Sequence, residues 1–248
     1  MDGRISIKQK YRILGVMNIV LTMGIFLLCI HYGTFTSMLK IFTGSDTDVY
    51  SYFCSKSEIY KYCPHTDDDI VFIGDSITDR GEFHEYFPSI SVKNRGIEGD
   101  TTEGILDRLD AICSVPPKKV FILAGINDIG DGINKEAFQK NYCSIVEKIK
   151  ESDSETEVYI QSILPVNHDM MINNRRNSRR TTEAINDYNE ILKDIAETSG
   201  GGVKYVDIGK QMMNADGDLD RQYTSDGVHL NGVGYQVWID TVREYVED

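Results

Sequence analysis

The sequence predicts an α/β domain, a doubly wound parallel sheet with helices on both faces, preceded by an apolar N-terminal segment. Strand and helix patterns alternate from Asp67 to the end of the chain, which is typical of parallel sheets whose strands are joined by helices. No internal repeat and no further domain boundary interrupt the alternation. The 248 residues, 41% of them hydrophobic and 26% charged, fit one such domain with an appendage, or two small domains.

Five short apolar runs are expected to form the strands. The first reads IVFIG and is rich in β-branched residues. The expected strands are residues 70–74, 91–94, 119–124, 158–163 and 203–207.

Apolar residues at helical spacing predict the connecting helices. Between residues 182 and 198 they recur three and four positions apart, and Glu183 suits the first turn of that helix. The expected helices are residues 101–113, 135–151, 182–198 and 232–246.

The N-terminus predicts a transmembrane anchor at residues 13–30. This run has no charge and follows a basic segment, residues 1–12. Eighteen residues in a helix span about 27 Å, close to the roughly 30 Å of a hydrocarbon core. The basic flank is expected to stay in the cytoplasm and the rest of the chain outside. A cleaved signal peptide, giving a secreted protein, and a buried helix are the alternatives; a signal peptide usually has a shorter apolar centre.

Residues 31–66 are expected to connect this anchor to the α/β domain at 67–248, with a helix at about residues 48–62. Outside the cell, Cys54 and Cys63 could form a disulfide, or both could be free thiols. Cys113 and Cys143 lie on apolar faces of expected helices, so we expect them to pack there.

The composition excludes some classes of partner. A net charge of −13 argues against nucleic acid, or an anionic bilayer, as the main partner of the globular part. No cluster of His, Cys, Asp and Glu suggests a metal site, and we expect no cofactor.

Ser76 lies in the most informative stretch, Gly74-Asp75-Ser76, directly after the first expected strand. Open α/β sheets bind their ligands at the carboxyl ends of the strands, where this serine is expected. A lone serine is usually a solvated loop or capping residue, so a base and oxyanion donors are needed to make it a nucleophile.

Asp226 and His229 supply a candidate base and its orienting carboxylate. They are three residues apart across a turn that Gly227 favours, so the carboxylate can bind one ring nitrogen while the other points outward. Alone, such a pair is more often a cap and a surface residue.

Two loops offer donors for a developing oxyanion. Asn94-Arg95-Gly96 follows the second strand, and its glycine lets a backbone N–H approach a ligand closely. Gly125-Ile126-Asn127-Asp128 follows the third strand and places a carboxamide there. Each is also a generic turn or helix cap.

Together, the blocks around Ser76, Gly96, Asn127 and His229 resemble, in order and spacing, those of the SGNH (GDSL-type) hydrolases. The resemblance covers about residues 67–248. Two further stretches are similar to a bacterial branch of the family, residues 94–109 (NRGIEGDTTEGILDRL) and residues 161–167 (QSILPVN). That branch includes carbohydrate acetylesterases and platelet-activating-factor acetylhydrolase-like enzymes. It implies a flavodoxin-like three-layer fold, with Ser76 as nucleophile, His229 as base and Asp226 as its orienting group. The implied oxyanion hole is the N–H of Ser76, the N–H of Gly96 and the amide of Asn127.

Other polar residues lie in or near these blocks. Asp75 and Asp128 are interpreted as carboxylates that bond loop amides, with Asp75 kept as a candidate substrate contact. Arg175, Arg176, Arg179 and Arg180 lie in an insert after the fourth strand. That insert is either a solvated loop or a site for an anionic substrate or lipid phosphates. Tyr235 and Trp238 are expected in the core rather than in a sugar platform.

These observations predict a membrane-tethered extracellular serine esterase that removes short acyl groups, such as acetyl, from carbohydrate. No long apolar lid to house a fatty tail follows Asp67. A lysophospholipase-like lipid acylhydrolase is the alternative, and a tethered glycan-binding module without turnover is the alternative of another class.

Overall fold

The computed structural model describes residues 47–63 and 65–248, which contain a five-stranded parallel sheet. The strands lie in the order β2-β1-β3-β4-β5. Their bounds are β1 Ile70–Gly74, β2 Val92–Gly96, β3 Lys119–Leu123, β4 Glu157–Gln161 and β5 Val203–Val206. The chain passes from β1 outward to β2 and then returns past β1 to β3, so the loops after β1 and β3 flank the point where the strand order reverses. That point is where open α/β sheets bind ligands.

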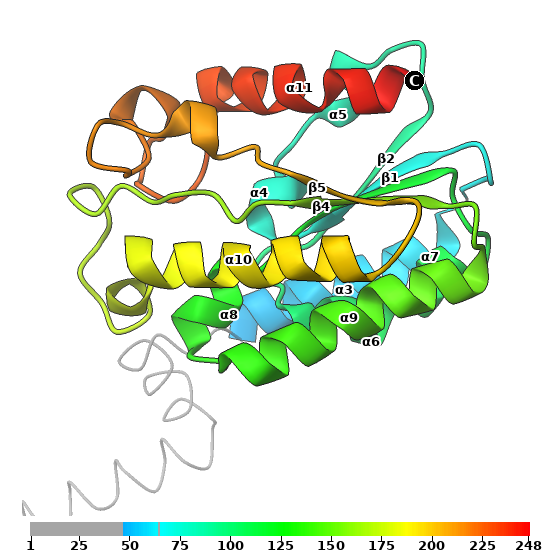
Figure 1. The fold of residues 1–248 in the computed structure, drawn as a ribbon, viewed down its shortest axis with the longest axis horizontal. Helices are drawn as coiled ribbons and strands as arrows, with labels where there is room; N and C mark the ends of the chain where they lie inside the picture. The colour runs from blue at the N-terminus through cyan, green and yellow to red at the C-terminus, as the bar shows by residue number, and fades with distance from the viewer. Residues whose placement is uncertain (1–46, 64) are drawn as a thin grey trace, which may run out of the picture. The chain divides into compact units, whose positions relative to one another are not determined.

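Helices cover both faces of the sheet (Figure 1). On one side lie α5 and α11, and on the other lie α6, α9 and α10. The longer helices are α9 Lys135–Ser152, α10 Thr182–Thr198 and α11 Gly232–Glu247; the shorter ones are α4 Ser76–Asp79, α5 Phe83–Tyr86, α6 Thr102–Arg108, α7 Asp110–Cys113 and α8 Ile126–Asp131. The 3₁₀ turns are η1 Asn177–Arg179, η2 Lys210–Met212 and η3 Arg221–Tyr223. The α/β class expected from the alternating pattern is confirmed.

The core contains a row of aromatic rings across three strands. Phe72 of β1 stacks on Phe121 of β3 with centroids 4.6 Å apart, and Phe121 stacks on Tyr159 of β4 at 4.5 Å. Trp238 of α11 packs edge-on against Phe83, and its Nε1 donates to Gln161 Oε1 over 2.6 Å. Trp238 is fully buried, so the core position expected for it is confirmed.

The expected helix at residues 101–113 is two helices, α6 and α7, joined at Leu109. The short helices α4, α5 and α8 had no counterpart in the sequence prediction. Each has six residues or fewer, so none repeats an apolar pattern often enough to reveal a helical period.

The helix expected at about residues 48–62 is α3, Thr47–Tyr62. From Ser51 on, the chain belongs to the same compact unit as the sheet. Lys56 Nζ binds Asp79 Oδ1 at 2.9 Å, and Tyr60 donates to the carbonyl of Gly96, also at 2.9 Å. The connector is therefore bonded at its C-terminal end to the domain that follows.

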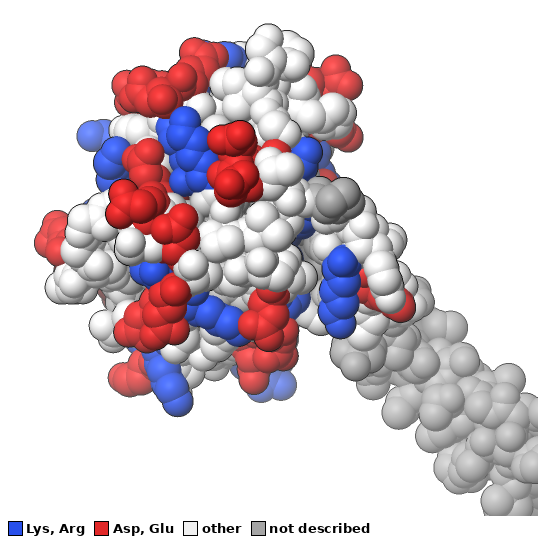
Figure 2. All heavy atoms as spheres, turned by 90° about the vertical axis from the view of Figure 1, so that its right-hand side faces the viewer, with Lys and Arg blue, Asp and Glu red and all other residues white. Residues whose placement is uncertain are grey.

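The anchor expected at residues 13–30 lies outside the described residues. Within residues 47–63 and 65–248, no helix combines the length and hydropathy needed to cross a bilayer. Cys54, Cys63, Cys113 and Cys143 are all free, and the last two pack against the core as expected. Figure 2 shows acidic and basic side chains interspersed over the face that lies at the right in Figure 1.

Candidate active site

The turn from β1 into α4 holds Ser76 at the carboxyl edge of the sheet, beside the loops that gather at the left in Figure 1. A Cβ atom on Gly74 would lie 2.2 Å from Thr78 Oγ1 and 2.3 Å from the carbonyl oxygen of Leu123. Only glycine therefore fits where the strand turns into α4. Asp75 caps α4, since its Oδ1 accepts from the N–H of Ile77 over 2.9 Å.

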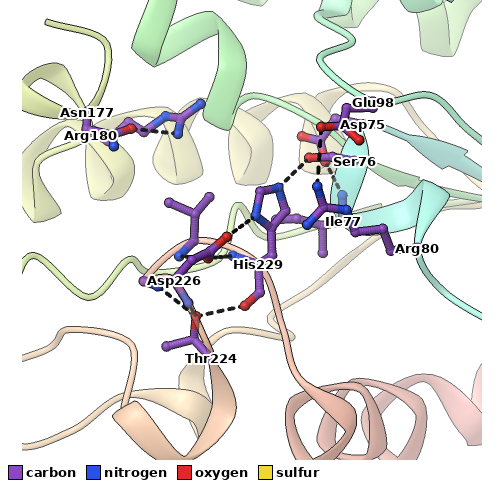
Figure 3. A network of polar contacts seen from close by, with 12 residues as sticks. Asp75, Ser76, Ile77, Arg80, Glu98, Asn177, Arg180, Thr224, Asp226 and His229 are labelled. Carbon is purple, nitrogen blue, oxygen red and sulfur yellow. Dashed lines mark hydrogen bonds and ion pairs between the residues drawn. The ribbon is translucent and has the colours of Figure 1, made fainter. Parts of the chain in front are cut away.

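Ser76, His229 and Asp226 form a continuous hydrogen-bonded chain (Figure 3). Ser76 Oγ lies 3.0 Å from His229 Nε2, and His229 Nδ1 lies 2.6 Å from Asp226 Oδ2. Because an ionised carboxylate only accepts, Nδ1 carries the proton and Nε2 is free to accept from the serine hydroxyl. This is the arrangement of a nucleophile with its general base.

Local hydrogen bonds fix the loop that carries His229. Asp226 Oδ1 accepts from the N–H groups of Val228 and His229 over 2.9 and 2.8 Å. These bonds and the His229 ring lower the pKa of Asp226 to about 2, against the opposing effect of burial. Gly227 has φ +88°, and a Cβ there would lie 2.6 Å from the carbonyl oxygen of Asn167. The turn thus requires glycine and keeps Asp226 ionised beneath the imidazole.

Asn127 lies at the start of α8 and is 4% exposed. Its Nδ2 donates to the carbonyl oxygen of Asp100 over 2.9 Å, and its Oδ1 accepts from Arg180 Nη2 over 2.9 Å. One of the two amide hydrogens is therefore engaged by the loop after β2. The second remains for a ligand.

In the loop after β2, the N–H of Gly96 is not free to bind an oxyanion, contrary to our expectation. The N–H of Gly96 donates to Asn94 Oδ1 over 2.8 Å, so it is already engaged. A Cβ on Gly96 would lie 2.2 Å from the backbone nitrogen of Asp79, which explains the glycine by close packing on α4. The candidate donor is instead Gly99, with φ +78°, whose N–H no described residue accepts. Gly99 precedes Asp100, the partner of Asn127.

Three buried carboxylates, Asp75, Asp100 and Asp128, lie behind the site. Asp75 is 1% exposed, and burial raises its pKa to about 7; its Oδ2 has no hydrogen-bond partner among the described residues. Burial also raises the pKa of Asp100 to about 6, although Arg108 Nε binds it at 2.8 Å. Asp128 accepts from the N–H and hydroxyl of Thr102. Asp75 and Asp128 thus bond backbone amides as expected. The substrate contact that we considered for Asp75 is wrong, because its side chain is buried.

The arginine insert folds back onto α8. Arg176 Nη2 binds Asp131 Oδ2 at 3.0 Å, and Arg179 Nη1 donates to the carbonyl oxygen of Gly130 at 3.0 Å. Arg180 is buried against Asn127, and only Arg175 is exposed. We expected either a solvated loop or four guanidinium groups that face an anionic substrate. That expectation is wrong for Arg176, Arg179 and Arg180, because their guanidinium groups bind protein acceptors.

Sequence reasoning missed Gly99 as an oxyanion donor, and it named Arg180 as a contact for an anionic substrate rather than as the partner of Asn127. Gly99 lies three residues after Gly96, and glycine adopts positive φ readily, but the sequence does not show which of the two has a free N–H. No local signal pointed to the contact between Arg180 and Asn127, because the two are 53 residues apart and only the packing of the insert on α8 brings them together.

Comparisons with known proteins agree with this geometry. Residues 72–237 match the GDSL-like Lipase/Acylhydrolase family. A Streptococcus pneumoniae structure named as a platelet activating factor superposes with a TM-score of 0.75 at 27% identity, covering 86% of this chain and 99% of that one. An acetylxylan esterase from Geobacillus stearothermophilus shares the fold, with a TM-score of 0.56 at 19% identity over 72% of this chain and 94% of that one.

Two curated relatives are also similar in sequence. The rat platelet-activating factor acetylhydrolase IB subunit alpha2 is 24% identical over 70% of this chain and 73% of its own length. The N-acylneuraminate cytidylyltransferase of Escherichia coli is 28% identical over 72% of this chain, but the match spans only 40% of that protein. With the family match over two thirds of its length and a Ser-His-Asp chain at the sheet edge, this chain belongs to the GDSL-like lipase/acylhydrolase family and is an SGNH-type esterase.

Proposed function

We propose that the protein hydrolyses short acyl esters, acetyl above all, on a carbohydrate. The observation that carries the proposal is the polar surround of the Ser76 hydroxyl. His229 lies on one side of it, and the ion pair of Arg80 with Glu98, at 3.2 Å and 43% exposed at each side chain, lies on the other (Figure 3). Such groups suit a hydroxyl-rich alcohol, and they offer little apolar surface to a long acyl chain.

The reaction follows from the positions of these groups. Ser76 Oγ attacks the ester carbonyl carbon while His229 Nε2 takes the hydroxyl proton. The oxyanion accepts hydrogen bonds from the N–H of Ser76, the N–H of Gly99 and the remaining amide hydrogen of Asn127. His229 then protonates the leaving alcohol, and a water molecule activated by His229 releases the acid from Ser76.

Two related names support an acetyl substrate. The rat relative is named for removing acetyl from platelet-activating factor, and the Geobacillus fold neighbour is named for acetylxylan. The two names differ in the alcohol, which is platelet-activating factor in one and xylan in the other, so the choice of a sugar rests on the polar surround described above.

A lipid acylhydrolase is the second candidate, and one observation favours it. Met171 lies against Gly227 in the catalytic loop, and the next residue, Ile172, is 77% exposed. These two side chains could receive the start of an acyl chain at the rim of the site.

A chain-length series of p-nitrophenyl esters, assayed with the full chain in detergent, separates the two candidates. The acetylesterase predicts the highest kcat/KM with acetate, followed by turnover of acetylated glycans in preference to lysophospholipids. Faster turnover of C8–C12 esters would refute it in favour of the lipid enzyme.

Ser76→Ala tests the nucleophile, with Ser114→Ala, an exposed serine of the α7 C-cap, as the matched control. Ser76→Ala should lower kcat by about 10⁴-fold or more and abolish labelling by a fluorophosphonate, since it removes the hydroxyl that bonds His229 Nε2. A wild type that neither turns over nor becomes labelled would favour a glycan-binding module.

We further propose that residues 13–30 tether the domain to the membrane with residues 31–248 outside the cell, on the strength of the uncharged run and its basic flank. Protease added to intact cells should remove residues 31–248. Full protection of that part would contradict the placement.

A further inference from the structure

Arg180 is a buried cation whose guanidinium nitrogens all bind protein acceptors. Nε donates to the carbonyl oxygen of Ile126 over 3.1 Å, Nη1 to Asn177 Oδ1 over 2.9 Å, and Nη2 to Asn127 Oδ1 over 2.9 Å. The residue is 7% exposed. Two of these acceptors belong to Ile126 and Asn127, consecutive residues at the start of α8. The guanidinium therefore contacts both the backbone next to the candidate oxyanion amide and the amide itself.

The contacts of Asn127 leave its amide one orientation. Arginine only donates and a backbone carbonyl only accepts, so Oδ1 must face Arg180 and Nδ2 must face Asp100. A rotated amide would set its NH₂ against the guanidinium and its oxygen against the Asp100 carbonyl. The second hydrogen of Nδ2 is thereby held in a fixed direction.

The charge of Arg180 also changes the strength of that hydrogen. A cation bonded to Oδ1 draws electron density toward the oxygen and makes the N–H a stronger donor. The effect is largest where water is excluded, and Asn127 is 4% exposed. A neutral donor at Oδ1 would orient the amide with weaker polarisation.

The backbone of Arg180 is held as well. His168 Nε2 lies 3.1 Å from the carbonyl oxygen of Arg180, and His168 Nδ1 lies 3.0 Å from Asp218 Oδ1. The N–H of Arg180 donates to the carbonyl oxygen of Asn177 over 3.0 Å. The residue is thus fixed at both backbone and guanidinium before any substrate arrives, as a preorganised site requires.

We propose that Arg180 is a positioning residue of the oxyanion hole. It orients and polarises the Asn127 amide from the face opposite the substrate, and it takes no part in proton transfer or substrate binding. The inference rests on the proposed esterase reaction. It predicts a loss in kcat with little change in KM, because the amide contacts the oxyanion only in the transition state.

A double-mutant cycle with p-nitrophenyl acetate tests the inference. Asn127→Ala should lower kcat by about 10²–10³-fold, as loss of one oxyanion donor does. Arg180→Met should lower it by about 10–10²-fold in the wild type, yet by less than about twofold in the Asn127→Ala background, because its effect passes through the missing amide. An equal loss in both backgrounds, or wild-type kcat for Arg180→Met, would overturn the proposal.

Arg180→Lys keeps the cation with fewer donors and serves if Arg180→Met unfolds. It should recover part of the lost kcat, with the same non-additivity toward Asn127→Ala; full loss in both backgrounds would count against the proposal. The rate of fluorophosphonate labelling should follow kcat across the set, and thermal unfolding reports folding of each variant. A wild type without turnover or labelling would defeat the esterase itself, whereas an active wild type with an additive cycle would defeat only the role of Arg180.

Discussion

Two Asp–His pairs lie in the loops at the carboxyl edge of the sheet, and they differ in what the second ring nitrogen meets. In one, Asp226 binds His229 Nδ1 at 2.6 Å, and Nε2 meets the hydroxyl of Ser76 at 3.0 Å. In the other, Asp218 binds His168 Nδ1 at 3.0 Å, and Nε2 meets the carbonyl oxygen of Arg180 at 3.1 Å. A hydroxyl can give up a proton and a carbonyl cannot. The group at Nε2 therefore determines which pair acts as a general base and which pair only stabilises a loop.

Replacing the two histidines by glutamine should give the largest difference in kcat between the two pairs. His229→Gln removes the base and should lower kcat by about 10⁴–10⁶-fold. His168→Gln keeps a donor for the Arg180 carbonyl and should cost less than about tenfold. Steady-state kinetics on p-nitrophenyl acetate, with thermal unfolding to confirm folding, measure both. Comparable losses would mean that His168 has a chemical role.

Replacing the two aspartates by asparagine tests the orienting groups. Asp226→Asn should lower kcat by about 10²–10⁴-fold, since the imidazole loses its tautomer and the charge that stabilises its protonated form. Asp218→Asn should change kcat by less than about threefold, and its hydrogen bonds to His168 and Thr182 contribute about 1 kcal/mol to the free energy of unfolding. A large kinetic effect of Asp218→Asn would contradict the comparison.

The carboxylates behind the site should differ from Asp226 in their response to pH. Asp75 has a folded pKa of about 7, raised above its unfolded value by burial. Its contribution to stability is fully present below about pH 4 and is lost as the pH rises through 7, because the folded state holds the proton more tightly. Asp75→Asn should therefore flatten the fall in unfolding free energy between about pH 4 and pH 7, a change of roughly 1–4 kcal/mol.

Urea unfolding across that pH range measures the effect of Asp75→Asn.

Asp226 should behave in the opposite way, because its pKa of about 2 lies below the unfolded value. Its contribution to the free energy of unfolding is present above about pH 4 and is lost as the pH falls through 2. An unchanged slope in Asp75→Asn would show that Asp75 stays ionised in the folded protein.

Much of the fold could be predicted because its signals are local. The strand IVFIG, the apolar period of residues 182–198 and the alternation of the two patterns each lie within a short window, and all five predicted strands are present. The break at Leu109 and the short helices α4, α5 and α8 could not be predicted. Tertiary contacts stabilise them, such as the bonds of Asn94 Nδ2 to the carbonyl oxygens of Thr78 and Gly81.

The site divides in the same way. Ser76, Asn127, Asp226 and His229 were named from the sequence because each follows a strand or precedes a helix within a recognisable block. Gly96 was named and Gly99 was missed, because a sequence does not show that the N–H of Gly96 is engaged by Asn94. The arginine insert was placed over the site as a solvated or anion-binding loop, and its packing on α8 gives the guanidinium groups other partners.

The sequence by itself determined the reaction, since it places a serine, a histidine with its aspartate, and an amide at the ends of strands that a parallel sheet brings to one edge. The tertiary structure decided how the amide is held. The contact between Arg180 and Asn127 joins residues 53 positions apart. No local pattern encodes it, because the insert has no period of its own and takes its conformation from the helix on which it packs.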